Sequence, residues 1–583
     1  MKTKFSISIM AVLLFFSLVS HAQSVLVVQP GVGTLNTAIK TYGGTRIYQL
    51  KAGEWYQLNG MVENVGYHLQ IIGQESAVKG GIPATLQTGT DAGGATFAQM
   101  FDAKGDITIK NVYLVNADLN GVFGNVFMIN SATNARTIID RCIIDPVGGS
   151  GVALYGANSK TYFTNNLCNR QGHQLNPNDG FMFITDNTSG AGFDSILVQN
   201  NTFVCMGTGL HSAAFGLYKN NFSKWDHNTF VEQKSQIDWS IFENEYYWTN
   251  NLMFDMQTQP WSPTWQPMPG ADKNQPKPCL IYADTILGET LPSKRVQFVE
   301  YNMHYRNPKF YTMLNELNVQ GKIDGKIPIN YMSLMYPVDS SSVSRESEMF
   351  NNRGSFPYWK AGNNTAEVDP QWADARIYTM SDKFVEWTRP ATKLLAMGYA
   401  ANQIPAVSSW TQFFWDPDGD VSNNLTWPVF NGVYRNPALL IGSIEGLPLG
   451  DLNWYPDAKA LWTKNKTRID AHMKAAIESK ITMLTALNSI NLSAIKTSCY
   501  PNPFTNELTV SYTVKNHADV KLTILTLNGQ TVAELVNQSK SAGDYTTKWN
   551  GTNAEGASMP NGIYLYRLQI GNEVASARIV KNK

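Results

Sequence analysis

The chain has 583 residues, 16% of them charged, and its 46 basic and 46 acidic side chains give no net charge. This balance lacks the basic surplus that nucleic-acid binding requires, so we expect no nucleic-acid partner. The length allows several domains, or one long solenoid with appendages. The five cysteines are too scattered for a disulfide framework and show no metal-binding spacing, which indicates small buried side chains. They are Cys142, Cys168, Cys205, Cys279 and Cys499.

The first residues, MKTKFSISIMAVLLFFSLVSHAQS, have the order of a secretory signal peptide, which we assign to residues 1–23. Lys2 and Lys4 precede an apolar run from Ile7 to Val19, and small and polar residues follow. The run is short for a bilayer-spanning helix, although an uncleaved anchor is the alternative. No other stretch is long and apolar enough to span a bilayer, so we expect no transmembrane segment in the mature chain.

From about Arg46 to Asp255 the sequence repeats a unit of two short strands that meet at a corner. The corners are Val112, Cys142, Asn166, Asn201, Asn228 and Asn251. They lie about 23 to 35 residues apart, which is typical of a solenoid whose loops vary in length. Asn occupies four corners because its amide can bond the coils above and below and because it tolerates a left-handed turn.

Alternation around the corners predicts two inward columns. Period two points the third residue before each corner and the second residue after it toward the interior. The first column is Ile109, Ile139, Phe163, Val198, Trp225 and Trp248, and the second is Leu114, Ile144, Cys168, Phe203, Phe230 and Met253. A third strand precedes each corner, as in TFAQMF, VFMIN, GVALY, GFMFIT, AAFGLY and WSIFE, so each coil has three sides. Separate β-sandwiches are the alternative, but they would not keep the columns in register.

Residues 225–230, WDHNTF, resemble the WxDHN corner of right-handed parallel β-helix proteins in the pectate-lyase-like superfamily. The segment from Asn178 to Asp186 is similar to the first-sheet strand of that group. The resemblance covers about 200 residues and implies a right-handed three-sheet parallel β-helix, hence an all-β fold class. It does not determine the activity, because this fold carries lyases, hydrolases, epimerases and binding proteins.

The repeat fades after Met256, although RVQFVEYNMHYRNPKF and EVDPQWAD are typical of late coils or decoration. Residues 457–490 have helical spacing, with Asp457 as a candidate N-cap, and we expect this helix to cover the open end of the prism. We therefore assign the β-helix to residues 24–305, and a loop-rich decoration with a capping helix to residues 306–495.

Residues 496–583 predict a small antiparallel β-sandwich with the strands ELTVSYTV, VKLTILTLNG, YTTKWNG, GIYLYRLQIG and ASARIVKNK. The motifs YPNPF and WNGTNAEGASMPNGIYLYRL and the basic C-terminus resemble the type A (Por) sorting domain of type IX secretion. The resemblance implies the type IX machinery as a partner and export across the inner and outer membranes. The protein would then be secreted or attached to the cell surface, usually without this tail. An immunoglobulin-like carbohydrate-binding module is the alternative.

In pectate-lyase-like proteins the substrate lies across the outer face of the first sheet, which corresponds here to coils between Arg170 and Glu245. The resemblance implies catalytic candidates His211, Lys219, Tyr218, Arg170 and His173; substrate-binding candidates Asn178, Lys234, Asp238, Trp239 and Glu245; and metal ligands Asp179, Asp186 and Glu243. β-Elimination of a uronate needs a base and a cation that neutralises the carboxylate. Calcium bound by clustered carboxylates is a candidate cofactor for the second task.

The chain departs from calcium-dependent pectate lyases at one strand. His211-Ser212-Ala213-Ala214-Phe215 stands where those enzymes carry two metal-binding acids, so the pectate-type calcium site does not carry over there. The Asp416–Asp420 loop is a second calcium candidate, but it departs from the EF-hand pattern and is otherwise a polar turn. Polygalacturonase signatures are absent, which ranks a hydrolase below a lyase.

Binding without catalysis is a third possibility, because aromatic side chains gather in one span and can stack on sugar rings. The candidates are Trp239, Tyr246, Tyr247, Trp261 and Trp265, whereas Trp248 belongs to the core column. The sequence thus predicts a protein that acts on an extracellular polysaccharide, as a lyase that cleaves an acidic polysaccharide by β-elimination. The alternative is a non-catalytic glycan-binding protein or adhesin at the cell surface.

Overall fold

The computed structural model describes much of the chain after residue 22. The described residues are 23–77, 80–171, 182–185, 192–206, 211–212, 220–233, 238–239, 243–256, 258, 296–326, 328–329, 331, 358–398, 413, 415, 430–478, 497–526, 530–571 and 573–582. Within them, no helix combines the length and the apolar character that crossing a membrane requires.

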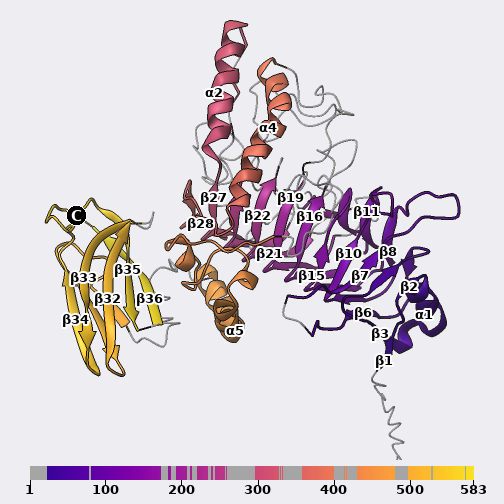
Figure 1. Cartoon of the computed structure of the whole chain (residues 1–583), viewed down its shortest axis with the longest axis horizontal. Coiled ribbons are helices and arrows are strands. Elements are labelled where there is room, and N and C mark those ends of the chain that lie inside the picture. Colours follow the sequence, from indigo (N-terminus) through magenta and orange to yellow (C-terminus); the bar gives the residue numbers. More distant parts are fainter. Residues whose placement is uncertain are drawn as a thin grey trace, which may run out of the picture.

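Three parallel sheets, here named A, B and C, form a parallel β-helix (Figure 1). Sheet A contains β1 (Ser24–Val27), β3 (Arg46–Leu50), β6 (Leu69–Gly73), β9 (Ile107–Lys110), β12 (Arg136–Asp140), β15 (Lys160–Thr164), β18 (Ser195–Gln199), β21 (Asn220–Asp226), β24 (Glu243–Thr249), β26 (Val296–Glu300) and β28 (Tyr358–Gly362). Sheet B contains β2 (Gly31–Val32), β4 (Trp55–Gln57), β7 (Ala84–Gln87), β10 (Val112–Val115), β13 (Ile143–Ile144), β16 (Leu167–Gln171), β19 (Thr202–Met206), β22 (Thr229–Gln233), β25 (Leu252–Phe254), β27 (Met303–Tyr305) and β29 (Thr365–Ala366). Sheet C contains β5 (Val62–Glu63), β8 (Gln99–Ala103), β11 (Val126–Asn130), β14 (Ser150–Leu154), β17 (Phe183–Thr185), β20 (His211–Ser212) and β23 (Asp238–Trp239).

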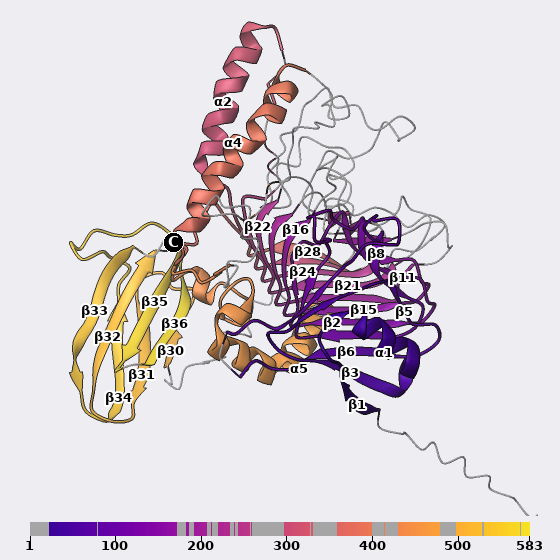
Figure 2. The ribbon, with the colours of Figure 1, turned by 45° about the vertical axis from the view of Figure 1, so that its right-hand side comes forward.

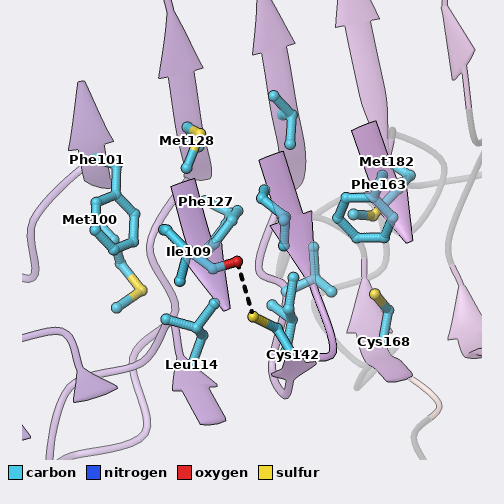
Figure 3. Packing of buried hydrophobic residues seen from close by; sticks show 14 of the residues in the cluster. Met100, Phe101, Ile109, Leu114, Phe127, Met128, Cys142, Phe163, Cys168 and Met182 are labelled. Atoms are coloured by element: carbon cyan, nitrogen blue, oxygen red, sulfur yellow. Dashed lines mark hydrogen bonds between the residues drawn. The ribbon is translucent and has the colours of Figure 1, made fainter. Parts of the chain in front are cut away.

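The two predicted inward columns are confirmed. Ile139 pairs with Ile109 on one side and with Phe163 on the other, and the register continues along sheet A to Trp248. The second column runs in the same way along sheet B, and all members of both columns are fully buried. Figure 3 shows Cys168 in this apolar core. Parallel register and period-two burial therefore position the three sheets.

The Asn corners form a ladder of amide hydrogen bonds that links adjacent coils. Asn166 donates to Asn201, Asn201 to Asn228 and Asn228 to Asn251, each over 2.9–3.1 Å. The ladder continues to Asn302 and Asn364, beyond the predicted repeat. The expectation that these Asn take the left-handed conformation is wrong, because the residue before each corner does so. These residues are Asn111, Arg141, Asn165, Asn200, His227, Asn250, Tyr301 and Asn363.

Helix α1 (Thr34–Tyr42) covers the N-terminal end of the prism, since Leu35 and Ile39 join its core. Helix α5 (Pro456–Glu478) starts one residue before the predicted N-cap Asp457. The expectation that this helix covers the open end is wrong. Trp462 and Ile469 pack with Phe298 of sheet A, and α5 therefore lies along the outer face of that sheet.

Helices α2 (Pro308–Ile323) and α4 (Arg376–Ala396) pack side by side and project from the solenoid (Figure 2). Asn307 caps α2 by accepting a hydrogen bond from Lys309 N. The base of α4 and residues 430–455 cover the C-terminal half of the outer face of sheet B, where Val231, Phe254 and Trp372 share one cluster. Short 3-10 turns at Gly43–Thr45, Leu439–Ile441 and Leu452–Trp454 complete the described helical segments.

The tail forms an antiparallel sandwich of two sheets. One sheet contains β30 (Thr497–Tyr500), β31 (Leu508–Val514) and β34 (Gly543–Trp549), and the other contains β33 (Thr531–Lys540), β32 (Ala518–Thr526), β35 (Gly562–Ile570) and β36 (Glu573–Lys581). The five predicted strands are present, whereas β30 and β33 were missed by the sequence reading. Leu522, Leu568 and Trp549 lie in the core between the sheets.

Candidate functional site

The outer face of sheet C is the long face of the prism that the described helices leave open. Helix α5 covers the late strands of sheet A and the base of α4 covers part of sheet B, whereas no described hydrophobic cluster packs a helix onto the outside of sheet C. Seven parallel strands about 4.8 Å apart make this face about 30 Å long. Its size and shape suit an extended polymer.

The backbone register of sheet C divides the candidate residues on its strands between two rows. His211 and Asp238 pair with each other and continue the row of Phe183 and Val152, which are buried in the core. Trp239 continues the other row, in which Asp102, Ile129 and Ile184 are half-buried and Ala153 is fully buried. The side chains of His211, Asp238 and Trp239 lie outside the described residues. By register, Trp239 is the candidate in the outward row.

Arg170, the next-to-last residue of β16, has a left-handed backbone conformation, and its side chain is firmly held. Its Nε donates to Asp145 Oδ1 over 2.5 Å, and its guanidinium lies 6.0 Å from the Phe123 ring centroid. Asp145 is almost fully buried, so this ion pair is shielded from water. The positive charge predicted at this position is therefore present, but it is paired with a carboxylate of the neighbouring coil.

Glu245 lies on β24, and this strand belongs to sheet A rather than to sheet C. Its carboxylate accepts a hydrogen bond from the Tyr247 hydroxyl at 3.2 Å. Glu243 begins the same strand, and its side chain lies outside the described residues. The remaining candidates also lie outside the described residues: His173, Asn178, Asp179, Asp186, Tyr218, Lys219 and Lys234.

The predicted aromatic platform is wrong at the two positions where the described side chains test it. Tyr246 is completely buried in the core, and Tyr247 packs with Phe222 and Phe298 under α5. Trp261 and Trp265 lie outside the described residues. Alternation on β24 favours burial of these rings on both faces because sheet A is covered by a helix.

The polar residues of the WxDHN-like corner fasten the C-terminal decoration to the solenoid. Asp226 accepts hydrogen bonds from Thr249 and Asn250 at 2.8 and 2.9 Å. His227 contacts Glu445 Oε2 at 3.3 Å and the Gly450 carbonyl at 3.2 Å. Burial opposes protonation of His227, but the Glu445 hydrogen bond and the Asp226 charge raise its pKa overall. Among the described residues, this corner therefore serves to hold the decoration on the solenoid.

A second buried polar cluster, here named the α4 seam, lies under the base of α4 and was missed by the sequence reading. It consists of Cys205, Glu232, Asp255, Asn307 and Ser381. The Cys205 thiol donates to Glu232 Oε2 at 3.2 Å, while Glu232 Oε1 has no partner among the described residues. Asp255 accepts from the Ser381 hydroxyl and from the Asn307 backbone N–H. The available signal was the recurrence of Cys205, Glu232 and Asp255 at or just after the ends of successive sheet B strands.

Burial raises the pKa of both carboxyl groups in the α4 seam. The pKa of Glu232 reaches about 8 despite the Cys205 hydrogen bond, and the neighbouring Asp255 raises it further. The pKa of Asp255 reaches about 7 despite the hydrogen bonds from Ser381 and Asn307. Burying a protonated carboxyl group costs less free energy than burying a carboxylate. The raised pKa values therefore allow both groups to lie buried under α4.

Metal binding finds no support in the part of the chain that the structure describes. Within it, no three His, Cys, Asp or Glu side chains come close enough to hold an ion. The calcium candidates Asp179, Asp186 and Glu243 and the Asp416–Asp420 loop have no described side chains. Cys142, Cys168 and Cys205 are buried free thiols, as predicted, and Cys499 is a half-buried free thiol.

The fold and the open face define a parallel β-helix protein with a C-terminal β-sandwich. Residues 504–573 match the family described as FlgD Ig-like domain. Among solved structures, the chain is similar to a PL6 family alginate lyase, AlyGC, at 14% identity and a TM-score of 0.27. The match covers 40% of this chain and 36% of that chain. Comparison with curated proteins gives no match.

Proposed function

We propose that this protein binds an extracellular acidic polysaccharide along the outer face of sheet C. The observation that carries the proposal is the open face of seven parallel strands, because an extended chain can lie across successive coils. By backbone register Trp239 stands in the outward row, and an indole at this position could stack on a sugar.

β-Elimination is the proposed chemistry at this face. Lys219, Tyr218 and His173 are candidate bases, and a cation must neutralise the uronate carboxylate. His211 is a weaker candidate base than the sequence alone indicates, because its register row contains core positions. Asp179, Asp186 and Glu243 would be the carboxylates available to calcium. The competing function is glycan binding without cleavage.

Incubation of the mature full chain with alginate, polygalacturonate and glucuronan, with calcium or with a chelator, tests this proposal. New ultraviolet absorbance from an unsaturated uronate supports the lyase, and its loss in the chelator supports calcium dependence. Retention without product supports the binding protein. If none of the three polymers is retained or cleaved, an acidic ligand at sheet C is wrong. Two variants then distinguish the base from the stacking contact. Lys219→Ala should abolish cleavage but keep retention, whereas Trp239→Ala should weaken retention.

We further propose that residues 496–583 direct export through the type IX pathway after the signal peptide is removed. The sorting motifs support this proposal, while the FlgD Ig-like match speaks only for an immunoglobulin-like sandwich. Deletion of residues 496–583 should trap the protein between the inner and outer membranes. Fractionation of cells with a functional type IX system tests this, and undiminished appearance in the medium or on the surface contradicts it.

A further inference from the structure

The outer face of sheet B changes character along the solenoid. Its C-terminal half is apolar and covered, with Val231, Phe254 and Met303 packed under the base of α4 and residues 430–455. The N-terminal strands β4 and β7 have no such cover in the described clusters, and their outward residues are Trp55, Gln57, Thr85 and Gln87. This open part of sheet B is here named the Trp55 face.

Among the tryptophans with described side chains, Trp55 is exposed, and 38% of its surface is accessible to solvent. Its indole orientation is fixed, because Nε1 donates to Gln87 Oε1 on the next coil at 3.0 Å. Gln87 is itself held by donation from Nε2 to the Ala117 carbonyl at 3.1 Å. Two hydrogen bonds across neighbouring coils thus present a preoriented aromatic ring to solvent, which lowers the entropic cost of binding.

Unpaired polar groups surround the ring. Thr85 pairs with Trp55 in the register, and Gln57 is two residues further along the same strand, on the same face. Both are half-buried, and neither side chain has a hydrogen-bond partner among the described residues. The adjoining outward positions on the neighbouring coils are Val32, Val115 and the buried Tyr113, and none of these residues is charged. A ligand that fits is therefore polar, uncharged and able to stack.

We propose that the Trp55 face is a second carbohydrate-binding site, which takes neutral sugar residues of a polysaccharide. The apolar face of a pyranose stacks on the indole, and its hydroxyl groups bond the Thr85 hydroxyl and the Gln57 amide. Neutral sugars satisfy these groups without leaving a charge unpaired, whereas a uronate meets no cation in these rows. This site is on a different sheet from the acidic-polysaccharide face and does not depend on it.

Affinity electrophoresis of the full chain through β-glucan, xylan and galactomannan gels tests the site. Wild-type protein should be retarded by at least one of these neutral polymers. Trp55→Ala should weaken retention by about tenfold, the size expected for loss of an aromatic stack. Trp55→Phe should retain part of the binding, and Gln87→Leu, which frees the indole, should weaken it less than Trp55→Ala. Tyr42→Ala is the matched control, since Tyr42 is an exposed aromatic residue on α1.

The outcomes separate this site from the sheet C face. Unchanged retention on alginate in Trp55→Ala, together with loss on the neutral polymer, supports two sites. Lack of retention on all three neutral polymers overturns the proposal, as does equal retention of wild type and Trp55→Ala. If sedimentation shows a dimer that Trp55→Ala dissociates, the face binds a second copy and the sugar site is wrong. Circular dichroism checks that each variant is folded.

Discussion

Glu232 is a carboxyl group buried between sheet B and the base of α4, with one oxygen unpartnered among the described residues. Its thiol partner Cys205 satisfies only the other oxygen. A carboxylate in this position would face the neighbouring Asp255, so two negative charges would develop on adjacent coils at high pH. Deprotonation of Glu232 would therefore place a second buried charge beside Asp255.

Glu232 makes the stability of the chain depend on pH, and Glu232→Gln should remove that dependence. Its pKa is raised from 4.5 to about 8, so the unfolded chain releases the proton first as the pH rises. The free energy of unfolding therefore falls between about pH 4.5 and pH 8 and has no further loss from this group above that window. The free energy of unfolding of Glu232→Gln, measured relative to that of wild type, should therefore rise by more than about 1 kcal/mol from pH 5 to pH 8.5. One pKa unit corresponds to about 1.4 kcal/mol.

Urea unfolding at the two pH values measures this effect. Glu54→Gln is the control, because Glu54 is exposed and should follow wild type at both pH values. Identical pH profiles of wild type and Glu232→Gln would show that Glu232 is ionised normally in the folded chain.

The Asn ladder is the main polar feature that successive coils share. Asn228 accepts from Asn201 N and Nδ2 at 3.1 and 2.9 Å, and it donates to the Val198 carbonyl at 3.0 Å. It also donates to Asn251 at 3.0 Å, and it is fully buried. Asn228→Ala leaves these groups without partners and should lower the free energy of unfolding by about 2–4 kcal/mol.

Chemical unfolding monitored by circular dichroism tests the ladder, and Asn120→Ala in an exposed loop is the matched control. We expect the control to change stability by less than about 0.5 kcal/mol. A loss as small as this in Asn228→Ala would mean that water replaces the ladder at little cost.

The columns of each coil were predictable because period-two burial leaves a local signal, whereas other features depend on contacts distant in sequence. The left-handed position at the corner is occupied by Asn165, His227 and Tyr301 among others, so no single residue type marks it. Strand β33 was missed because its pairing with β32 shifts register twice, which breaks the alternation.

The candidate site was less predictable than the core. Strand positions such as Trp239 follow from the coil period, but the candidates in loops of variable length do not. The Trp55 face was missed because its exposure depends on where the decoration ends on sheet B, and this is a tertiary property. Conversely, Tyr247 looked exposed because the cover provided by α5 comes from residues far along the chain. Tyr246 instead points into the core together with Trp248, two residues further along the same strand.

At the scale of the whole molecule, the C-terminal sandwich contacts the decoration and the late coils. Leu525 and Leu565 pack on Ala438 and Ile441. The Arg578 guanidinium lies 5.7 Å from the Tyr301 ring centroid. Burial raises the pKa of Tyr301 to about 12, so its ring stays neutral under Arg578. The described contact is formed by a few side chains, so it can open without unfolding either part.

Leu565→Asp should therefore detach the sandwich while both parts stay folded, because a carboxylate cannot be buried against Ala438 and Ile441 without a partner. We expect amide hydrogen exchange at residues 438–441 to accelerate about tenfold, which corresponds to the loss of one buried leucine contact. Small-angle X-ray scattering should show a larger radius of gyration. Arg567→Asp is the matched control, since Arg567 is exposed on the same strand and should leave both measurements unchanged. Exchange that stays at the wild-type rate in Leu565→Asp would show that other contacts hold the sandwich in place.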